Sequence, residues 1–255
     1  MTGRQGWVRQ ASWMTLAFLY LPVIVLVMFS FNESRLSASW QGFSWRWYGA
    51  LFQDSALRAA TTNSLAVAVC STLLVILLGV PASIGLERIA SRHQSWIEPL
   101  FLLPLVIPEV VMGVGLLLMF VLIQMPLSLM TVVIGHAAFN LPVVIVIVRA
   151  RLRKLDPRLY EAALDLGANP WQAFLRITLP LLRPAIAGAM LMAFTISLDD
   201  FIVTFFVAGP GATTLPLKVY SMIKSGLSPE INALSALLVI LSMGCVTWSL
   251  LLQRR

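Results

Sequence analysis

Long apolar stretches without charged residues alternate along the chain with shorter segments that carry most of the polar residues. The first such stretch covers Ala11–Phe31, and a second ends near Leu86. A helix needs about 20 apolar residues to cross the hydrocarbon core of a membrane, and these stretches reach that length. Because apolar and polar residues do not alternate within them, the pattern favours helices over the strands of a membrane barrel. The sequence therefore predicts an all-α membrane protein.

Five apolar regions supply six predicted spans. Between Pro99 and Val148 the only formal charge is Glu109, so this region must contain two spans, and Gln124-Met125-Pro126 provides the turn between them. We expect spans at about residues 11–31, 63–86, 99–123, 128–148, 184–207 and 231–252. Together with a cytoplasmic loop at 149–183, these spans form one predicted transmembrane domain over residues 1–255.

Composition and charge agree with a membrane environment. The chain is 59% apolar and 11% charged, and its mean hydropathy is +0.87. A net charge of +7 would suggest nucleic acid in a polar protein, but here the charges lie between apolar runs. With the N-terminus inside, 13 of the 18 lysines and arginines fall on the cytoplasmic side, including Arg254 and Arg255. We therefore expect both termini in the cytoplasm, the lipid bilayer as the surroundings, and no nucleic-acid partner.

The predicted cytoplasmic loop contains two helix starts in close succession. Asp156-Pro157 provides a cap and a first helical residue, and Gly167 suits a left-handed helix end. Asn169-Pro170 begins a second short helix, with Gln172 in the capping-box position, and this helix is expected to run to about Thr178. The pattern alone fits either an amphipathic elbow whose arginines pair with lipid phosphates or a docking element for a partner protein.

The same loop carries a spaced motif. Glu161-Ala162-Ala163, Gly167, Ile177 and Leu179-Pro180 follow one another at the spacing of the EAA loop, and the segment resembles that loop in the permease subunits of ATP-binding-cassette (ABC) importers. The resemblance implies a type I ABC importer permease fold, in which the first short helix is a coupling helix that fits a groove on a separate ATPase subunit. The implied coupling residues are Glu161, Ala162, Ala163, Asp165, Gly167, Ile177, Leu179 and Pro180.

ATP hydrolysis is not expected on this chain. A phosphate-binding P-loop requires Gly-Lys followed by Ser or Thr. The three lysines, Lys154, Lys218 and Lys224, follow Arg, Leu and Ile instead. We therefore expect a non-enzymatic subunit that binds no cofactor, with ATP and Mg²⁺ on partner subunits. Cys70 and Cys245 lie inside apolar runs without ligand spacing, so no metal site is expected either.

Three acidic residues lie inside the predicted spans. Glu109, Asp199 and Asp200 are costly to place there, and such residues usually serve function. Consecutive helical residues point about 100° apart, so Asp199 and Asp200 cannot both face a pathway unless the helix unwinds. The alternatives are that Asp200 pairs with a neighbouring helix and that Glu109 caps a helix that restarts after Pro108. We expect His136 in a hydrogen bond between helices. The candidate pathway residues are Asp199, Asp200, Glu109 and Phe201, with Asp199 first.

Further segments narrow the resemblance. They cover Leu105–Val110, Ser197–Phe201, Gly209–Pro216 and Ser228–Leu234, and they look like the permeases of spermidine/putrescine importers, most closely the second permease of that system. The resemblance implies a polyamine substrate, a second homologous permease, two ABC ATPase subunits, a periplasmic polyamine-binding protein and a bacterial inner-membrane location. Two alternatives stay open: another small substrate such as amino acids, and an ion-coupled secondary transporter that uses the three acids as a proton relay.

Overall fold

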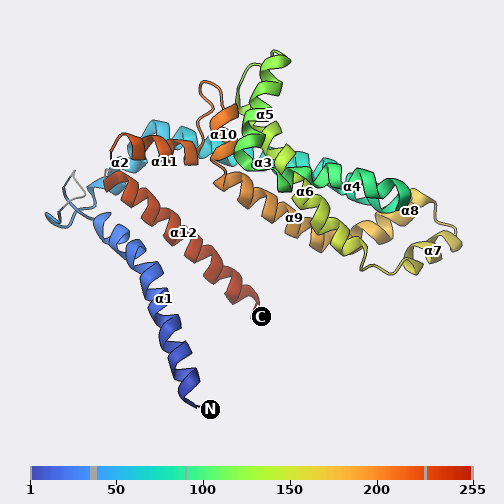
Figure 1. The fold of residues 1–255 in the computed structure, drawn as a ribbon, viewed down its shortest axis with the longest axis horizontal. Coiled ribbons are helices and arrows are strands. Elements are labelled where there is room, and N and C mark those ends of the chain that lie inside the picture. The colour runs from blue at the N-terminus through green and yellow to red at the C-terminus, as the bar shows by residue number, and fades with distance from the viewer. Residues whose placement is uncertain (1, 35–38, 90, 227–228, 254–255) are drawn as a thin grey trace. The chain divides into compact units, whose positions relative to one another are not determined.

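The computed structural model describes residues 2–34, 39–89, 91–226 and 229–253. Ser228, Arg254 and Arg255, which entered the predictions above, lie outside these ranges. Within the described ranges every element is a helix, apart from one isolated bridge between Asn32 and Phe43. The helices are α1 (Thr2–Phe29), α2 (Arg46–Gln53), α3 (Ser55–Arg88), α4 (Ser91–Val106), α5 (Glu109–Leu122), α6 (Leu129–Leu152), α7 (Arg158–Asp165), α8 (Pro170–Ala173), η1 (Phe174–Thr178), α9 (Leu179–Asp199), α10 (Ile202–Val207), α11 (Leu215–Lys224) and α12 (Pro229–Gln253) (Figure 1).

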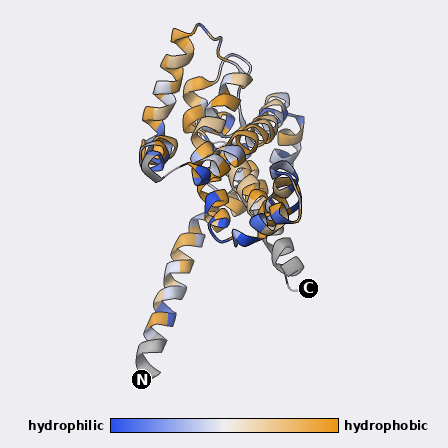
Figure 2. Cartoon of the chain, turned by 90° about the vertical axis from the view of Figure 1, so that its right-hand side faces the viewer, coloured by the Kyte–Doolittle hydropathy of each residue, from blue (hydrophilic) through white to orange (hydrophobic). Residues whose placement is uncertain are grey.

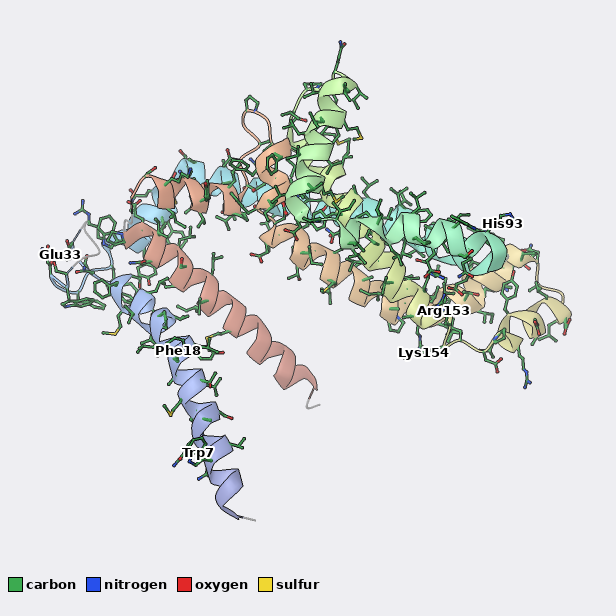
Figure 3. All side chains as sticks on the ribbon, in the orientation of Figure 1. Trp7, Phe18, Glu33, His93, Arg153 and Lys154 are labelled. Atoms are coloured by element: carbon green, nitrogen blue, oxygen red, sulfur yellow. The ribbon has the colours of Figure 1, made fainter. Side chains whose placement is uncertain are left out.

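The chain divides into two compact units, and each is described by itself. The first holds Met1–Arg58 and Lys218–Arg255, and the second holds Ala59–Leu217. In the first unit α12 contacts both α1 and α2. From Trp7 onward the side chains of α1 are mostly exposed, and Trp7 and Phe18, labelled in Figure 3, are 79% and 78% exposed. An apolar helix with such exposure has the surface of a membrane span, and apolar residues colour most of the helices in Figure 2.

Within the part of the chain that the structure describes, four helices are long and apolar enough to cross a membrane, and a fifth candidate is a bent pair. The four helices lie within α1, within α3, in α6, and in the continuous run Pro170–Asp199. The pair consists of α4 and α5, which meet at 106°. The part of α12 from Pro229 to Ile240 is a shorter apolar helix. The count of six spans therefore stays a prediction.

Two predicted spans are broken rather than straight. The span expected at 99–123 consists of α4 and α5, because Pro108 lacks an N–H donor and also disfavours helical geometry at the preceding residue. The span expected at 184–207 consists of α9 and α10, because Asp200 is extended with ψ 126°. The second span also differs, since α3 begins at Ser55 rather than near residue 63.

The core of the second unit forms where α6 packs against α9. Val144 and Val148 of α6 lie fully buried with Leu182, Ala189 and Ala193 of α9. A second cluster surrounds α10, whose Val203 and Val207 pack with residues of α5 and α6. Small residues on α9 let the two backbones approach closely, as is common between membrane helices.

An ion-pair cluster holds three helices together at one end of this unit. Arg149 of α6 is nearly buried, and its guanidinium lies 2.6 Å from Glu87 of α3 and 2.7 Å from Glu98 of α4. Arg153, which is half exposed, also binds Glu87, at 3.0 Å. The distribution of positive charge predicts both arginines only as cytoplasmic charges. Their acidic partners, Glu87 and Glu98, are negative residues at the ends of predicted spans, in otherwise basic surroundings.

Replacing Arg149 by methionine is expected to lower the free energy of unfolding by about 3 kcal/mol, because two partly buried carboxylates lose their shared partner. Arg153→Met is the matched control, with an expected loss below about 1 kcal/mol, because Arg153 is largely solvated. Thermal denaturation of the two purified variants in detergent measures the difference. Equal stability losses would show that the buried arginine does not hold the three helices.

Candidate functional site

The break between α9 and α10 is built around Asp200. Its carboxylate accepts hydrogen bonds from the backbone N–H of Val203 at 3.3 Å and of Thr204 at 2.9 Å, and from the Thr204 hydroxyl at 2.9 Å. These bonds satisfy the free donors at the start of α10 as an N-cap would. The helix therefore unwinds at Asp200, which is the condition under which Asp199 and Asp200 can both face one pathway.

Asp200 also belongs to a buried polar network between helices. His136 of α6 lies with its Nε2 atom 3.0 Å from Asp200 and its Nδ1 atom 2.6 Å from the Ser197 hydroxyl. Ser197 in turn shares a hydrogen bond of 3.0 Å with Ser71 of α3. The prediction of an interhelical hydrogen bond for His136 is confirmed. Asp200 pairs with a neighbouring helix, which is the structural alternative considered for it above.

Asp200→Ala is expected to lower the free energy of unfolding by about 1–3 kcal/mol, because the N–H groups of α10 and His136 lose a buried acceptor. Asp200→Asn should cost less, since asparagine also caps helices. The neighbouring Asp199→Ala is the control and should leave stability unchanged, because Asp199 is exposed. Melting temperatures of the three variants test this order, and a larger loss for Asp199→Ala would contradict it.

A pocket of about 400 Å³ lies beside this break. All four candidate pathway residues line it: Glu109, the first residue of α5, Asp199, the last residue of α9, and Asp200 and Phe201 between α9 and α10. Phe139 of α6 completes the aromatic part of the lining. The two broken spans thus bring together residues that lie far apart in the sequence. Their contact with a substrate stays a prediction.

The residues that line the pocket favour a positively charged ligand. Asp199 and Glu109 are both exposed, so their carboxylates are accessible, and the faces of Phe139 and Phe201 attract cations. The C-terminal end of α9 adds the negative end of a helix dipole. Transporters commonly form their sites at such interrupted helices. The pocket is therefore a candidate cation site.

The second candidate site is the loop around α7. Asp156 accepts a hydrogen bond from the Arg158 N–H at 3.0 Å just before α7, but the N-cap residue is Pro157, so α7 starts one residue later than predicted. Gly167 has a φ of +89°, as predicted for a left-handed helix end, and its N–H bonds to the Leu164 carbonyl at 2.9 Å. Only glycine adopts this conformation without strain, so the turn after α7 depends on it.

The second short helix starts as predicted but ends differently. Asn169 and Gln172 form a reciprocal capping box at the start of α8. The prediction that this helix stops near Thr178 is wrong, because it continues through the π-helical turn η1 into α9. In η1 the Leu179 N–H reaches back to the Phe174 carbonyl, and this wider turn accommodates Pro180. The loop is therefore continuous with the helix that ends at Asp199.

α7 presents an exposed surface. None of its residues is buried, Glu161, Ala162 and Asp165 are exposed, and Leu166 just beyond its end is 89% exposed. Leu166 therefore presents an exposed apolar side chain next to the acidic Asp165, and the docking role predicted for α7 stays a prediction. Ile177 of η1 lies behind α7, and Leu179 and Pro180 begin α9.

Two bacterial permeases are similar to nearly the whole chain. The spermidine/putrescine transport system permease protein PotC of Escherichia coli (strain K12) is 40% identical over 238 residues, which cover 93% of this chain and 90% of that protein. The putrescine transport system permease protein PotI of the same strain is 41% identical over 243 residues, covering 92% and 86%.

A solved structure shares the fold. It is a bacterial ABC transporter involved in the import of the acidic polysaccharide alginate, with a TM-score of 0.72 at 16% identity over 98% of this chain and 96% of that one. The fold is thus that of an ABC importer permease. The family model described as "Binding-protein-dependent transport system inner membrane component" matches residues 76–255. This multi-pass chain belongs to that family of inner-membrane transport permeases.

Proposed function

We propose that the chain is one of two permease subunits of an ATP-driven importer of polyamines such as spermidine or putrescine. The observation that carries the substrate proposal is the pocket lined by Asp199, Glu109, Phe139 and Phe201. A polyamine is a flexible chain of methylene groups with several protonated amines. Carboxylates bind its charges, and the aromatic and apolar lining accepts both the amines and the methylene groups. The names of PotC and PotI support the same substrate class.

The proposed arrangement in the membrane has six spans with both termini in the cytoplasm. The spans are α1, α3, the pair α4–α5, α6, α9 with α10, and α12. The basic residues around Arg149 and Arg153 then lie on the inner side, as the distribution of positive charge favours. The pocket at Asp199 lies in the outer half of its span in this orientation.

In the proposed complex, a second homologous permease completes the pathway, and two ATPase subunits bind ATP and Mg²⁺. A periplasmic binding protein delivers the polyamine. α7 is the coupling helix, and Leu166 with Glu161 and Asp165 forms the surface that docks on an ATPase subunit. Because α8, η1 and α9 are one continuous helix, movement of α7 reaches Asp199 along a rigid element.

Uptake by the complex in proteoliposomes tests this proposal. The four components are reconstituted, and labelled spermidine, putrescine and arginine are offered with ATP inside the vesicles. We expect ATP-dependent uptake of a polyamine and none of arginine. Uptake of arginine without uptake of either polyamine would contradict the polyamine proposal and favour an amino-acid substrate. Uptake by this chain without ATPase subunits, driven by a proton gradient, would instead show a secondary transporter.

A further inference from the structure

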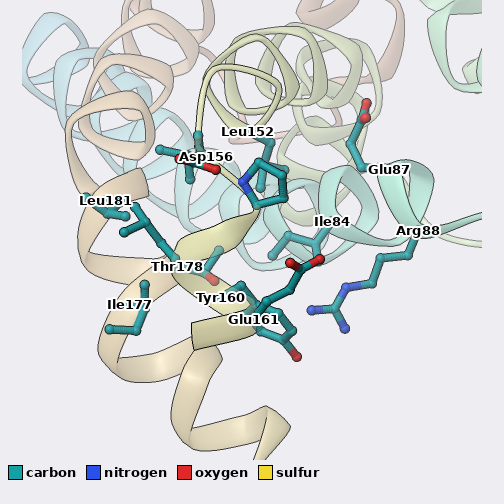
Figure 4. A pocket seen from close by; sticks show the side chains of 13 residues that line it. Ile84, Glu87, Arg88, Leu152, Asp156, Tyr160, Glu161, Ile177, Thr178 and Leu181 are labelled. Carbon is teal, nitrogen blue, oxygen red and sulfur yellow. The ribbon is translucent and has the colours of Figure 1, made fainter. Parts of the chain in front are cut away.

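A cavity separates α7 from the end of the helix bundle. Its volume is about 260 Å³, and its apolar lining comes from α3, α6, η1 and α9 as well as from the segment around α7. Figure 4 shows this space from close by. Side chains on opposite sides of a gap lose the close contacts through which packed helices push on each other. Across this cavity the side chains of α7 are therefore not closely packed against the bundle, whereas beside it α7 contacts η1.

One specific contact crosses the rim of the cavity. The guanidinium carbon of Arg88, the last residue of α3, lies 5.5 Å from the centre of the Tyr160 ring on α7. This distance falls within the range of a cation–π interaction. Figure 4 shows Arg88 reaching toward Tyr160, whereas the neighbouring Glu87 points elsewhere. At the end of α3, Arg88 thus contacts α7, while the adjacent Glu87 points away and can bind other helices.

Glu87 belongs to the ion-pair cluster that joins α3 to α6. Its carboxylate binds Arg149 at 2.6 Å and Arg153 at 3.0 Å, both on α6, and Arg149 also holds Glu98 of α4. Because Glu87 and Arg88 are adjacent, a force on Tyr160 reaches three helices through one short segment of α3. This path is separate from the continuous helix that joins α8 to α9.

We propose that the end of α3 is a second mechanical link between α7 and the helix bundle, with Arg88 as the positioning residue that holds α7 through Tyr160. The inference rests on the proposed role of α7 as the coupling helix. With both links, a displacement of α7 moves α3 and α9 together. Without the Arg88 contact, α7 pulls on α9 alone, and part of each ATP-driven movement fails to open the pathway.

The ratio of polyamine taken up to ATP hydrolysed measures this link in the reconstituted complex. Arg88→Ala and Tyr160→Leu are each expected to lower the ratio by about two- to fivefold, the range that the loss of an exposed cation–π contact gives. Arg88→Lys and Tyr160→Phe keep the cation and the ring and should stay near the unmodified ratio. The double variant should be no worse than either single one, because both remove the same contact. Lys154→Ala, an exposed lysine of the same loop, is the control.

An unchanged ratio in Arg88→Ala and Tyr160→Leu, or losses that add in the double variant, would overturn the link. If Arg88→Ala does not assemble with the ATPase subunits, Tyr160→Leu against Tyr160→Phe decides, and equal ratios overturn it. Gly167→Pro in the same assay separates the two proposals. If Gly167→Pro loses uptake while Arg88→Ala keeps its ratio, only the second link fails. If Gly167→Pro keeps normal uptake, the coupling role of α7 fails as well.

Discussion

Asp199→Asn is expected to lower polyamine uptake by the reconstituted importer by about tenfold or more at sub-saturating substrate. The reason is the loss of a charged acceptor for a protonated amine, a contact worth about 1.5–3 kcal/mol. Asp199 is exposed on the pocket, whereas the carboxylate of Asp200 is already bonded within the protein. The substitution keeps the size of the side chain, so assembly with the partner permease and the ATPase subunits should not change.

Two further variants make this result specific. Asp199→Glu keeps the charge and should retain most of the uptake. Glu33→Gln removes an exposed acid outside the pocket and should leave uptake unchanged. Initial rates are measured over a range of spermidine and putrescine concentrations. Normal uptake by Asp199→Asn at low substrate would remove this residue from the pathway and leave Glu109 as the accessible acid of the pocket.

Local signals in the sequence predicted the loop well. Asp156, Gly167 and the pair Asn169 and Gln172 act on backbone groups within a few residues, so their hydrogen bonds follow from the sequence itself. The end of the second helix was predicted wrongly, because that prediction relied on one local signal, Pro180. A proline usually ends a helix, but here Pro180 lies after a π-helical turn that absorbs it. Such a turn has no simple sequence signal.

The roles of the buried charged residues depended on distant parts of the chain. Asp199 and Asp200 look alike in the sequence, and only His136 and Ser197, together with the start of α10, tell them apart. For Arg149 the sequence likewise predicted only an inside-facing charge, and its ion pairs with Glu87 and Glu98 follow from how the helices pack. Helical periodicity predicts which residues lie in a span. It does not predict which partners the packing of several helices brings to them.

The two broken spans depend both on local sequence signals and on contacts between distant residues. Span length predicted one span over α4 and α5, while Pro108 left open a helix that restarts at Glu109, and the structure has that restart. The break at Asp200 was visible only as a pair of adjacent acids. Both breaks border the pocket, so the departures from regular helices coincide with the candidate site. Interrupted helices leave backbone groups and charges available to a substrate, which is why regular periodicity fails where function is expected.

Gly167→Pro is expected to reduce ATP-coupled uptake to near background while the chain still inserts into the membrane. Gly167 has a φ of +89°, and its N–H donates to the Leu164 carbonyl at 2.9 Å. Proline fixes φ near −65° and has no N–H group, so the turn between α7 and α8 must change its path. Because α8 continues into α9, a changed turn alters the direction in which α7 pulls on the helix that ends at Asp199.

The size of the effect should follow the backbone strain in a graded series. A Cβ at Gly167 would meet no atom within 4 Å, so Gly167→Ala adds only the strain of its positive φ, about 1–2 kcal/mol, and should reduce uptake partly. Gly226→Ala, at a φ of +114° and equally open, is the matched control outside the loop and should keep full uptake. Uptake, ATP hydrolysis and co-purification with the ATPase subunits are measured for each variant. Because α7 acts as a lever only if its angle to α8 is fixed, normal coupled uptake by Gly167→Pro would contradict that role.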